Sequence, residues 1–281
     1  MTLSAAHTAK GKLQRALLEL LRVHERDGTL PTSARFLFYE LVQAGVVSKT
    51  RTGARRADQN TIDALTHLRE AQLVPWEWIV DETRELTRWQ TAQSVAQYVL
   101  ASIKQATLDP WGAQAAPLIL CESRSLAGVL RSVASEYACP IASTNGQSRG
   151  FLVSQVAPQL QPSQRVLYLG DFDHCGNQIE AATRRTLEQH SGVTREWERI
   201  ALTAEQVREF DLPVISKADN RYRPVRYYDA VETEAIGQAE IVAALRSRLD
   251  ELLPEPLDDV RERQQQQREQ VTQQLRELTN P

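Results

Sequence analysis

The chain has 281 residues, of which 42% are hydrophobic and 25% are charged, as in ordinary folded proteins. No apolar run approaches the roughly 20 residues that cross a membrane, and the first residues lack the basic and apolar layout of a signal peptide. The three cysteines form neither a disulfide framework nor a zinc pattern, so we expect a cytoplasmic protein without membrane contact.

The net charge of -3 is distributed unevenly along the chain. Residues 1–56 contain ten Lys and Arg and four acidic residues, a net charge of +6. The remainder contains 23 basic and 32 acidic residues, a net charge of -9. A basic N-terminal part on an acidic body favours contact with a polyanion, although a solvated basic face would give the same composition.

Helical spacing of apolar residues predicts three helices in the N-terminal part, near residues 13–21, 33–45 and 60–68. The aromatic stretch of residues 73–80 is predicted to be extended, as a pair of strands or a wing. Three short helices followed by a β element are the parts of a winged helix, a helix-turn-helix variant. We therefore predict a winged-helix domain over residues 1–88.

The rest of the chain predicts an α/β domain. A linking helix is expected within residues 89–112, and strands and helices alternate after Pro117. Strands are predicted at 118–121, 140–143 and 166–169, and helices at 125–137, 149–160 and 178–189. Such alternation indicates a parallel sheet, here expected over residues 113–256. The polar tail, residues 257–281, is either a helix that packs on a partner or a frayed extension.

Acidic residues follow two of the predicted strands. Glu122 comes directly after one strand, and Asp171 and Asp173 come just after another. Ligands of parallel sheets bind beyond the carboxyl ends of the strands, so three carboxylates would meet there if the two strands pair. Oxygen ligands suit Mg2+, which would offset their repulsion. An Asp-x-Asp alone is also explained by a strand-to-helix turn with a capping Asp, and Glu122 is what favours a metal site.

These residues resemble a known family. Glu122 after one apolar strand and Gly170-Asp-Phe-Asp173 after another resemble the Toprim domain of topoisomerases, primases and some nucleases. Residues 199–213 resemble a segment of the A subunit of topoisomerase VI and its relatives, which include meiotic double-strand-break proteins. Residues 73–84 resemble the segment after the winged helix in small bacterial and phage proteins of that group. The resemblance covers about residues 30–240 and implies a winged helix followed by a Rossmann-like Toprim domain.

The resemblance also implies a nucleophile. The winged helix of that family carries an Arg-x-x-aromatic-Tyr signature whose tyrosine attacks DNA, and Arg35-Phe-Leu-Phe38-Tyr39 fits it. A phenol with a pKa of about 10 is a weak nucleophile at neutral pH. Arg35 would stabilise the phenolate and the pentacovalent phosphate, and Mg2+ would stabilise the leaving 3′ oxygen. Without the resemblance, Tyr39 would be interpreted as a packing aromatic of its helix.

The chain departs from the family pattern in two respects. The family often has Pro and an aromatic residue after Asp-x-Asp, where this chain has His174 and Cys175. We expect His174 to be a surface group or to lie behind the metal ligands. The chain contains no Gly-rich phosphate loop or ATPase motif, so ATP-dependent strand passage would need a separate ATPase subunit.

Basic residues near these motifs are candidates for DNA contacts, because Lys and Arg position a protein on phosphates. They are Lys49, Arg51, Arg55, Arg56 and Arg124. A solvated loop explains the first four equally well. Glu232 and Glu234 lie in a stretch that resembles an acidic segment of the family, and either is a candidate to face the metal site.

We therefore expect a nucleoid-associated enzyme, a homodimer that cleaves double-stranded DNA with Mg2+. Tyr39 of one subunit would meet the metal of the other, held by Glu122, Asp171 and Asp173, and form a 5′-phosphotyrosyl link. One alternative is a hydrolytic Toprim nuclease of the plasmid-defence type, in which water replaces Tyr39. Another is a non-catalytic DNA-binding subunit. RNA as the substrate and the number of metal ions stay open.

Overall fold

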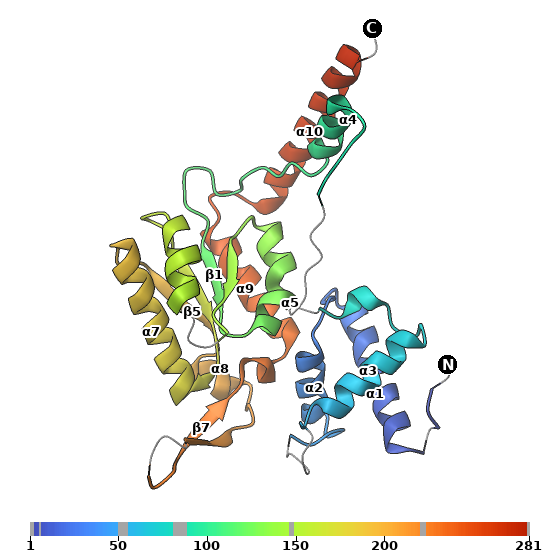
Figure 1. Cartoon of the computed structure of the whole chain (residues 1–281), viewed down its shortest axis with the longest axis vertical. Helices are drawn as coiled ribbons and strands as arrows, with labels where there is room; N and C mark the ends of the chain where they lie inside the picture. Colours follow the sequence, from blue (N-terminus) through green and yellow to red (C-terminus); the bar gives the residue numbers. More distant parts are fainter. Residues whose placement is uncertain are drawn as a thin grey trace.

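The computed structural model describes residues 3–5, 7–49, 56–80, 89–145, 149–219 and 223–279. Figure 1 shows three parts: an N-terminal group of helices, an α/β region, and a pair of helices that projects from the α/β region. Within the described residues, no helix is both long and apolar enough to cross a membrane.

The N-terminal part contains the three predicted helices, which are α1 (Ala9–Arg26), α2 (Ala34–Gln43) and α3 (Gln59–Glu70). Thr8 caps α1 and Ser33 caps α2, because each side chain accepts a hydrogen bond from a free backbone N–H of the first turn. The apolar faces of the helices form one buried cluster that includes Leu17, Leu37 and Leu68. The three-helix prediction is confirmed.

The predicted β wing is wrong for residues 73–80. Trp76–Trp78 form a single 3-10 turn, η1, and the only β contact described there is one parallel bridge between Thr32 and Ile79. Pro75 precedes the turn with φ fixed near -58°, and Arg69 both stacks over the Trp76 ring and donates a hydrogen bond to its carbonyl oxygen. These contacts favour a turn over a strand, so the winged-helix assignment is not confirmed.

The α/β region is built on a four-stranded parallel sheet in the order β2-β1-β3-β5. Its strands are β1 (Leu118–Cys121), β2 (Ile141–Ser143), β3 (Val166–Leu169) and β5 (Trp197–Ala201). The first three are the predicted strands, and the prediction of a parallel α/β region is confirmed. β1 and β3 are neighbours, with Cys121 opposite Leu169.

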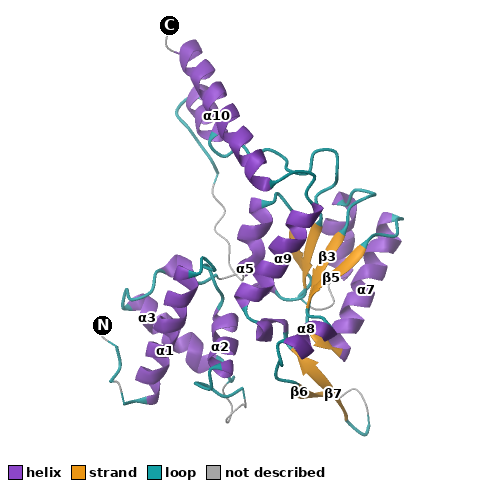
Figure 2. Ribbon diagram, turned by 180° about the vertical axis from the view of Figure 1, so that it is seen from behind, coloured by secondary structure: helices purple, strands orange, loops and turns teal. Residues whose placement is uncertain are grey.

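Helices cover both faces of this sheet (Figure 2). Side chains alternate between faces, so Ile119 and Leu167 pack with α5 (Arg124–Glu136) and α9 (Gln238–Leu252). The opposite face, with Tyr168, packs with α7 (His174–Ser191). The predicted helix over 149–160 is confirmed as a continuous helical run, but its type changes along its length. It passes from α6 (Arg149–Phe151) through the π-helix η2 (Leu152–Val156) to the 3-10 turn η3 (Ala157–Gln159), where Pro158 has no N–H for an α-helical hydrogen bond.

A second, antiparallel sheet lies beyond the carboxyl ends of β1 and β3, in the order β4-β7-β6. The sequence pattern did not predict it. Its strands and the adjoining short helices are β4 (Phe172–Asp173), β6 (Ile215–Asp219), β7 (Arg226–Val231), α8 (Ala204–Glu209) and η4 (Thr233–Ile236). The chain leaves β7 and enters η4 beside α2, and Gln43 donates a hydrogen bond to the Ala235 carbonyl.

The N-terminal helices and the α/β region share one core. Phe36, Phe38 and Tyr39 of α2 belong to the same buried cluster as Ile236 and the sheet residues. Gln238 reinforces the junction by donating hydrogen bonds to the carbonyl oxygens of Thr29 and Pro31. This junction fixes α2 against the α/β region.

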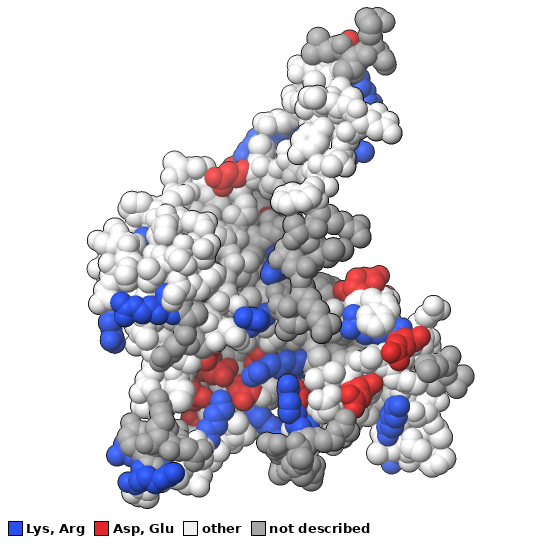
Figure 3. All heavy atoms as spheres, viewed as in Figure 1, with Lys and Arg blue, Asp and Glu red and all other residues white. Residues whose placement is uncertain are grey.

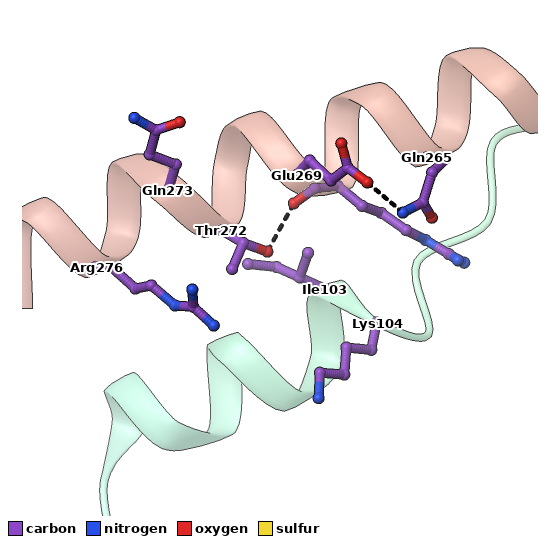
Figure 4. Close-up of a pocket in the computed structure, with 8 residues that line it drawn as sticks. Ile103, Lys104, Gln265, Glu269, Thr272, Gln273 and Arg276 are labelled. Atoms are coloured by element: carbon purple, nitrogen blue, oxygen red, sulfur yellow. Dashed lines mark hydrogen bonds between the residues drawn. The ribbon is translucent and has the colours of Figure 1, made fainter.

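The polar tail is a helix, α10 (Leu257–Thr279), and it packs on α4 (Val95–Ile103) of the same chain. Gln264 accepts a hydrogen bond from Leu108 N, and Arg268 donates to the Ala106 carbonyl. Figure 4 shows Ile103 of α4 and the following Lys104 facing a polar stretch of α10 across a shallow groove. α4 leaves Val95, Tyr98 and Val99 exposed, in spite of its apolar composition.

Candidate functional site

The sheet brings the three predicted carboxylates together. Glu122 N donates to the Leu169 carbonyl at 2.8 Å, so the ends of β1 and β3 lie side by side. Glu122 Oε2 then accepts a hydrogen bond from Asp171 N at 3.1 Å. The carboxylate of one strand is thus tied directly to the backbone that follows the other.

Asp171 and Asp173 each use one carboxylate oxygen to hold the backbone. Asp173 Oδ1 caps α7 by accepting from Gly176 N at 2.6 Å, which confirms that it serves as a capping Asp. Asp171 Oδ1 accepts from the N–H of Thr233 at 2.9 Å and from its hydroxyl at 3.1 Å. The second oxygen, Oδ2, of each Asp points to a cation. Asp173 therefore caps a helix and also lines the candidate site.

That cation is Lys217 of β6. Its ammonium lies 2.9 Å from Asp173 Oδ2 and 3.9 Å from Asp171 Oδ2. A cavity of about 210 Å³ opens at this point. It is lined by Glu122, Asp171, Asp173, His174, Cys175, Lys217, Ala218 and Tyr228. His174 stacks on the Tyr228 ring at 4.5 Å, so it forms part of the wall as a surface group.

The backbone beside Glu122 requires glycine. A Cβ on Gly170 would lie 2.8 Å from Glu122 Oε2 and 2.8 Å from the Tyr168 hydroxyl oxygen. Arg199 fixes the same turn from behind, because Nη1 donates to the carbonyl oxygens of Gly170 and Asp171 at 3.1 and 3.2 Å. The carboxylates therefore stand on a close-packed turn.

Tyr39 lies at the other side of the site and is 7% exposed. Its ring packs edge-on against Phe38, and two cations cover it. Lys49 Nζ lies 4.5 Å and the Arg35 guanidinium 5.9 Å from the ring centroid, both within range of a cation–π interaction. The predicted nucleophile is thus held next to the Arg of its signature.

The two cations over Tyr39 reach the acidic side of the site in the same chain. Arg35 Nε lies 2.8 Å from Glu234 Oε1, and Arg35 Nη2 lies 3.3 Å from Glu232 Oε2. Lys49 Nζ lies 3.5 Å from Glu232 Oε2, and Lys217 Nζ lies 3.6 Å from Glu232 Oε1. Glu232 therefore connects the side that holds Tyr39 with the side that holds the aspartates.

Glu234 is the deeper of the two glutamates, with a side chain that is 1% exposed. Its Oε1 also accepts hydrogen bonds from the hydroxyls of Ser123 and Ser125, both at 3.2 Å. Ser123 caps α5 directly after Glu122. The buried carboxylate thus ties α2 to the start of the helix that follows the first acidic residue.

Burial and mutual charge shift the pKa values of the site. Burial, helped by the nearby charge of Asp171, raises the pKa of Glu122 to about 7. Burial and the charges of Lys217 and Arg35 lower the pKa of Lys49 to about 8. For Asp173, burial is outweighed by hydrogen bonds from Gly176 N and Lys217, which hold its pKa below the usual range.

The donor chemistry fits a hard divalent cation. Glu122, Asp171 and Asp173 offer carboxylate oxygens that the backbone does not use. Together with Glu232 and Glu234 they make five carboxylates against three cations in contact with them, a formal charge of -2. The described residues nevertheless contain no group of three or more His, Cys, Asp or Glu already spaced to hold a metal ion. Lys217 occupies part of the space between the aspartates.

The predicted DNA-contact residues do not behave alike. Lys49 turns into the site. Arg56 is exposed and pairs with Asp58, and Arg124 is exposed at the start of α5, two residues after Glu122. Arg51 and Arg55 lie outside the described residues. Figure 3 shows acidic side chains gathered with basic ones between the α/β region and the N-terminal helices, so the site is a strongly charged part of this face.

Sequence reasoning missed Lys217. It lies on the unpredicted β6, opposite Tyr228 of β7, and only this antiparallel register brings it to the aspartates. Glu232 was named as a candidate, but its three cationic neighbours come from distant segments. No local pattern signalled that arrangement.

Comparison with known proteins gave no match, whether with protein-family models, with curated proteins or with solved structures.

We predict that Gly170→Ala destabilises the protein by about 1–3 kcal/mol, because the added Cβ would clash with Glu122 and Tyr168. Chemical denaturation measures the effect. Gly150→Ala is the matched control, since its Cβ would meet nothing within 4 Å. Equal stabilities of the two variants would show that the turn is not close-packed.

We also predict a pH effect at Glu122. Its folded pKa is raised above the unfolded value of 4.5, so the folded state binds the extra proton and loses stability as the pH rises from about 4.5 to 7. Glu122→Gln removes this loss. The free energy of unfolding of the variant should therefore rise relative to wild type between pH 5 and 8, by on the order of 1 kcal/mol after allowance for solvent screening.

Denaturation curves at several pH values measure that difference. Glu209→Gln, the same substitution at an exposed position, is the control. A difference between Glu122→Gln and wild type that does not change with pH, or that is no larger than the difference for Glu209→Gln, would contradict the prediction.

Proposed function

We propose that this protein cleaves DNA with the help of Mg2+, in the manner of a topoisomerase VI A subunit. The N-terminal helices would act as the DNA-binding part, and the parallel sheet would act as a Toprim-like domain. One observation carries the proposal: Arg35 and Lys49 contact both the Tyr39 ring and the acidic side of the site. A nucleophile and an acidic, cation-binding centre are thus joined within one chain.

In the proposed reaction, the Tyr39 hydroxyl oxygen attacks a backbone phosphorus and loses its proton to solvent. The bond from tyrosine to phosphorus forms, the bond from phosphorus to the 3′ oxygen breaks, and the 3′ oxygen takes up a proton. Arg35 and Lys49 stabilise the developing phenolate and the phosphate charge. Mg2+, held by Glu122, Asp171 and Asp173, would supply positive charge for the leaving oxygen.

A hydrolytic nuclease is the second candidate, and one observation favours it. Tyr39 is 7% exposed, which restricts the approach of a phosphate to its hydroxyl. In this case Glu122, Asp171 and Asp173 suffice, and Tyr39 serves packing alone.

The contacts that join Arg35 and Lys49 to Glu232 lie within one chain, and they support a site in which Tyr39 acts with the carboxylates of its own chain, in place of the exchange between subunits that the resemblance implied. A homodimer remains part of the proposal, and the exposed apolar side chains of α4 are a surface that a second copy would cover. A separate ATPase subunit and association with the nucleoid are proposed only if the protein takes part in ATP-dependent DNA strand passage. A non-catalytic DNA-binding subunit is the third candidate.

A plasmid assay with denaturing trapping tests the proposal. We predict that wild type with Mg2+ yields linear DNA with protein attached to its 5′ ends. Tyr39→Phe and Glu122→Ala should each reduce cleavage by about 100-fold or more, because they remove the nucleophile and a metal ligand. Tyr227→Phe, an exposed tyrosine on β7, is the matched control and should cleave like wild type.

The same assay separates the candidates. Hydrolysis gives linear DNA without attached protein, Tyr39→Phe stays active and Glu122→Ala is inactive. A non-catalytic subunit retains DNA without cutting it, and retention survives Glu122→Ala.

A further inference from the structure

Three cations from separate parts of the chain converge on one carboxylate. Arg35 lies on α2, Lys49 follows α2, and Lys217 lies on β6. Their nitrogens lie 3.3, 3.5 and 3.6 Å from the oxygens of Glu232. Since cations repel one another, such convergence needs an anion at its centre.

The burial of these side chains differs in a consistent way. Glu232 is 13% exposed, whereas Lys49, Lys217 and Arg35 are 28%, 39% and 43% exposed. The carboxylate therefore lies beneath the cations, which keep an open side toward solvent. Two of the three are fixed from below by further acids, Arg35 by Glu234 and Lys217 by Asp173.

The three cations also have a defined position within the site, because they contact Tyr39 and the aspartates as well. Lys49 and Arg35 cover the Tyr39 ring at one end, and Lys217 touches Asp171 and Asp173 at the other. An anion bound on the open side of the three cations would lie between the nucleophile and the aspartates. A phosphodiester carries one negative charge, as the Glu232 carboxylate does, and Lys and Arg are its usual partners.

We propose that Arg35, Lys49 and Lys217 form the seat for one phosphodiester group of a nucleic acid, and that Glu232 is the internal anion that holds the three cations in the free protein. Glu232 is then a positioning residue that also competes with the phosphate for its cations. This deepens the proposed function, on which it rests, because it names the residues that receive the backbone. It is tested by binding without cleavage.

The first arm of the test measures the affinity for a fluorescently labelled DNA duplex by anisotropy in EDTA, where no cleavage occurs. Glu232→Gln releases the cations and removes one negative charge, so it should bind about five- to tenfold more tightly than wild type. Glu209→Gln removes the same charge from an exposed position away from the seat and should change affinity less than about twofold.

The second arm removes the cations singly. Lys49→Met and Lys217→Met should each weaken binding about five- to tenfold and make the plot of log affinity against log salt less steep by about 1, the loss of roughly one phosphate contact. Lys104→Met, in the groove between α4 and α10, is the control and should leave both quantities unchanged. Thermal unfolding of each variant confirms that it is folded, and the lysine variants decide the question if Glu232→Gln does not fold.

The proposal is overturned if Glu232→Gln binds no better than Glu209→Gln, or if both lysine variants keep the affinity and salt slope of Lys104→Met. The same changes on RNA of equal length would support the seat and extend it to phosphodiesters in general. If the wild-type protein does not cleave the plasmid but these binding changes are observed, the proposed reaction is rejected and the phosphodiester seat is kept. Failure of the proposed function and failure of the seat are therefore distinguishable.

Discussion

The ion pair between Arg35 and Glu234 is the interaction on which the site depends. A carboxylate that is 1% exposed would be strongly destabilising without a cation and hydrogen-bond donors, and Arg35, Ser123 and Ser125 supply them to Oε1, whereas the buried Oε2 has no hydrogen-bond partner among the described residues. Because Arg35 lies on α2 and Glu234 on η4, this ion pair holds the N-terminal helices against the α/β region. Tyr39 is placed by the same contact, one turn further along α2.

The other charged side chains of the site lie at the carboxyl ends of the parallel strands. Parallel strands deliver Glu122 and Asp171 to one edge, and the turn at Gly170 holds them close enough to share a hydrogen bond. That density of carboxylates raises the pKa of Glu122 by burial and by repulsion from Asp171. Lys217 offsets part of the repulsion.

The local sequence pattern was enough to predict part of the fold and part of the candidate site. Apolar runs followed by acids predicted β1, β3 and the meeting of Glu122 with Asp171, because strand pairing and alternation depend on neighbouring residues. The wing failed, since Pro75 and the stacking of Arg69 on Trp76 outweigh the β preference of aromatic residues. The contact of Arg35 with Glu232 spans 197 residues, and Lys217 reaches the aspartates only through the β6–β7 register. No local rule predicts contacts of that kind.

The central claim is that the tyrosine side and the acidic side form one site in a single chain. A double-mutant cycle on the free energy of unfolding tests it most directly, with Arg35→Met, Glu234→Gln and the double variant. We predict a coupling energy of about 1–3 kcal/mol. The exposed pair of Arg22 and Glu19, which lies within one helix, is the control and should couple by about 0.5 kcal/mol or less. A coupling between Arg35 and Glu234 no larger than that of the control would contradict the account.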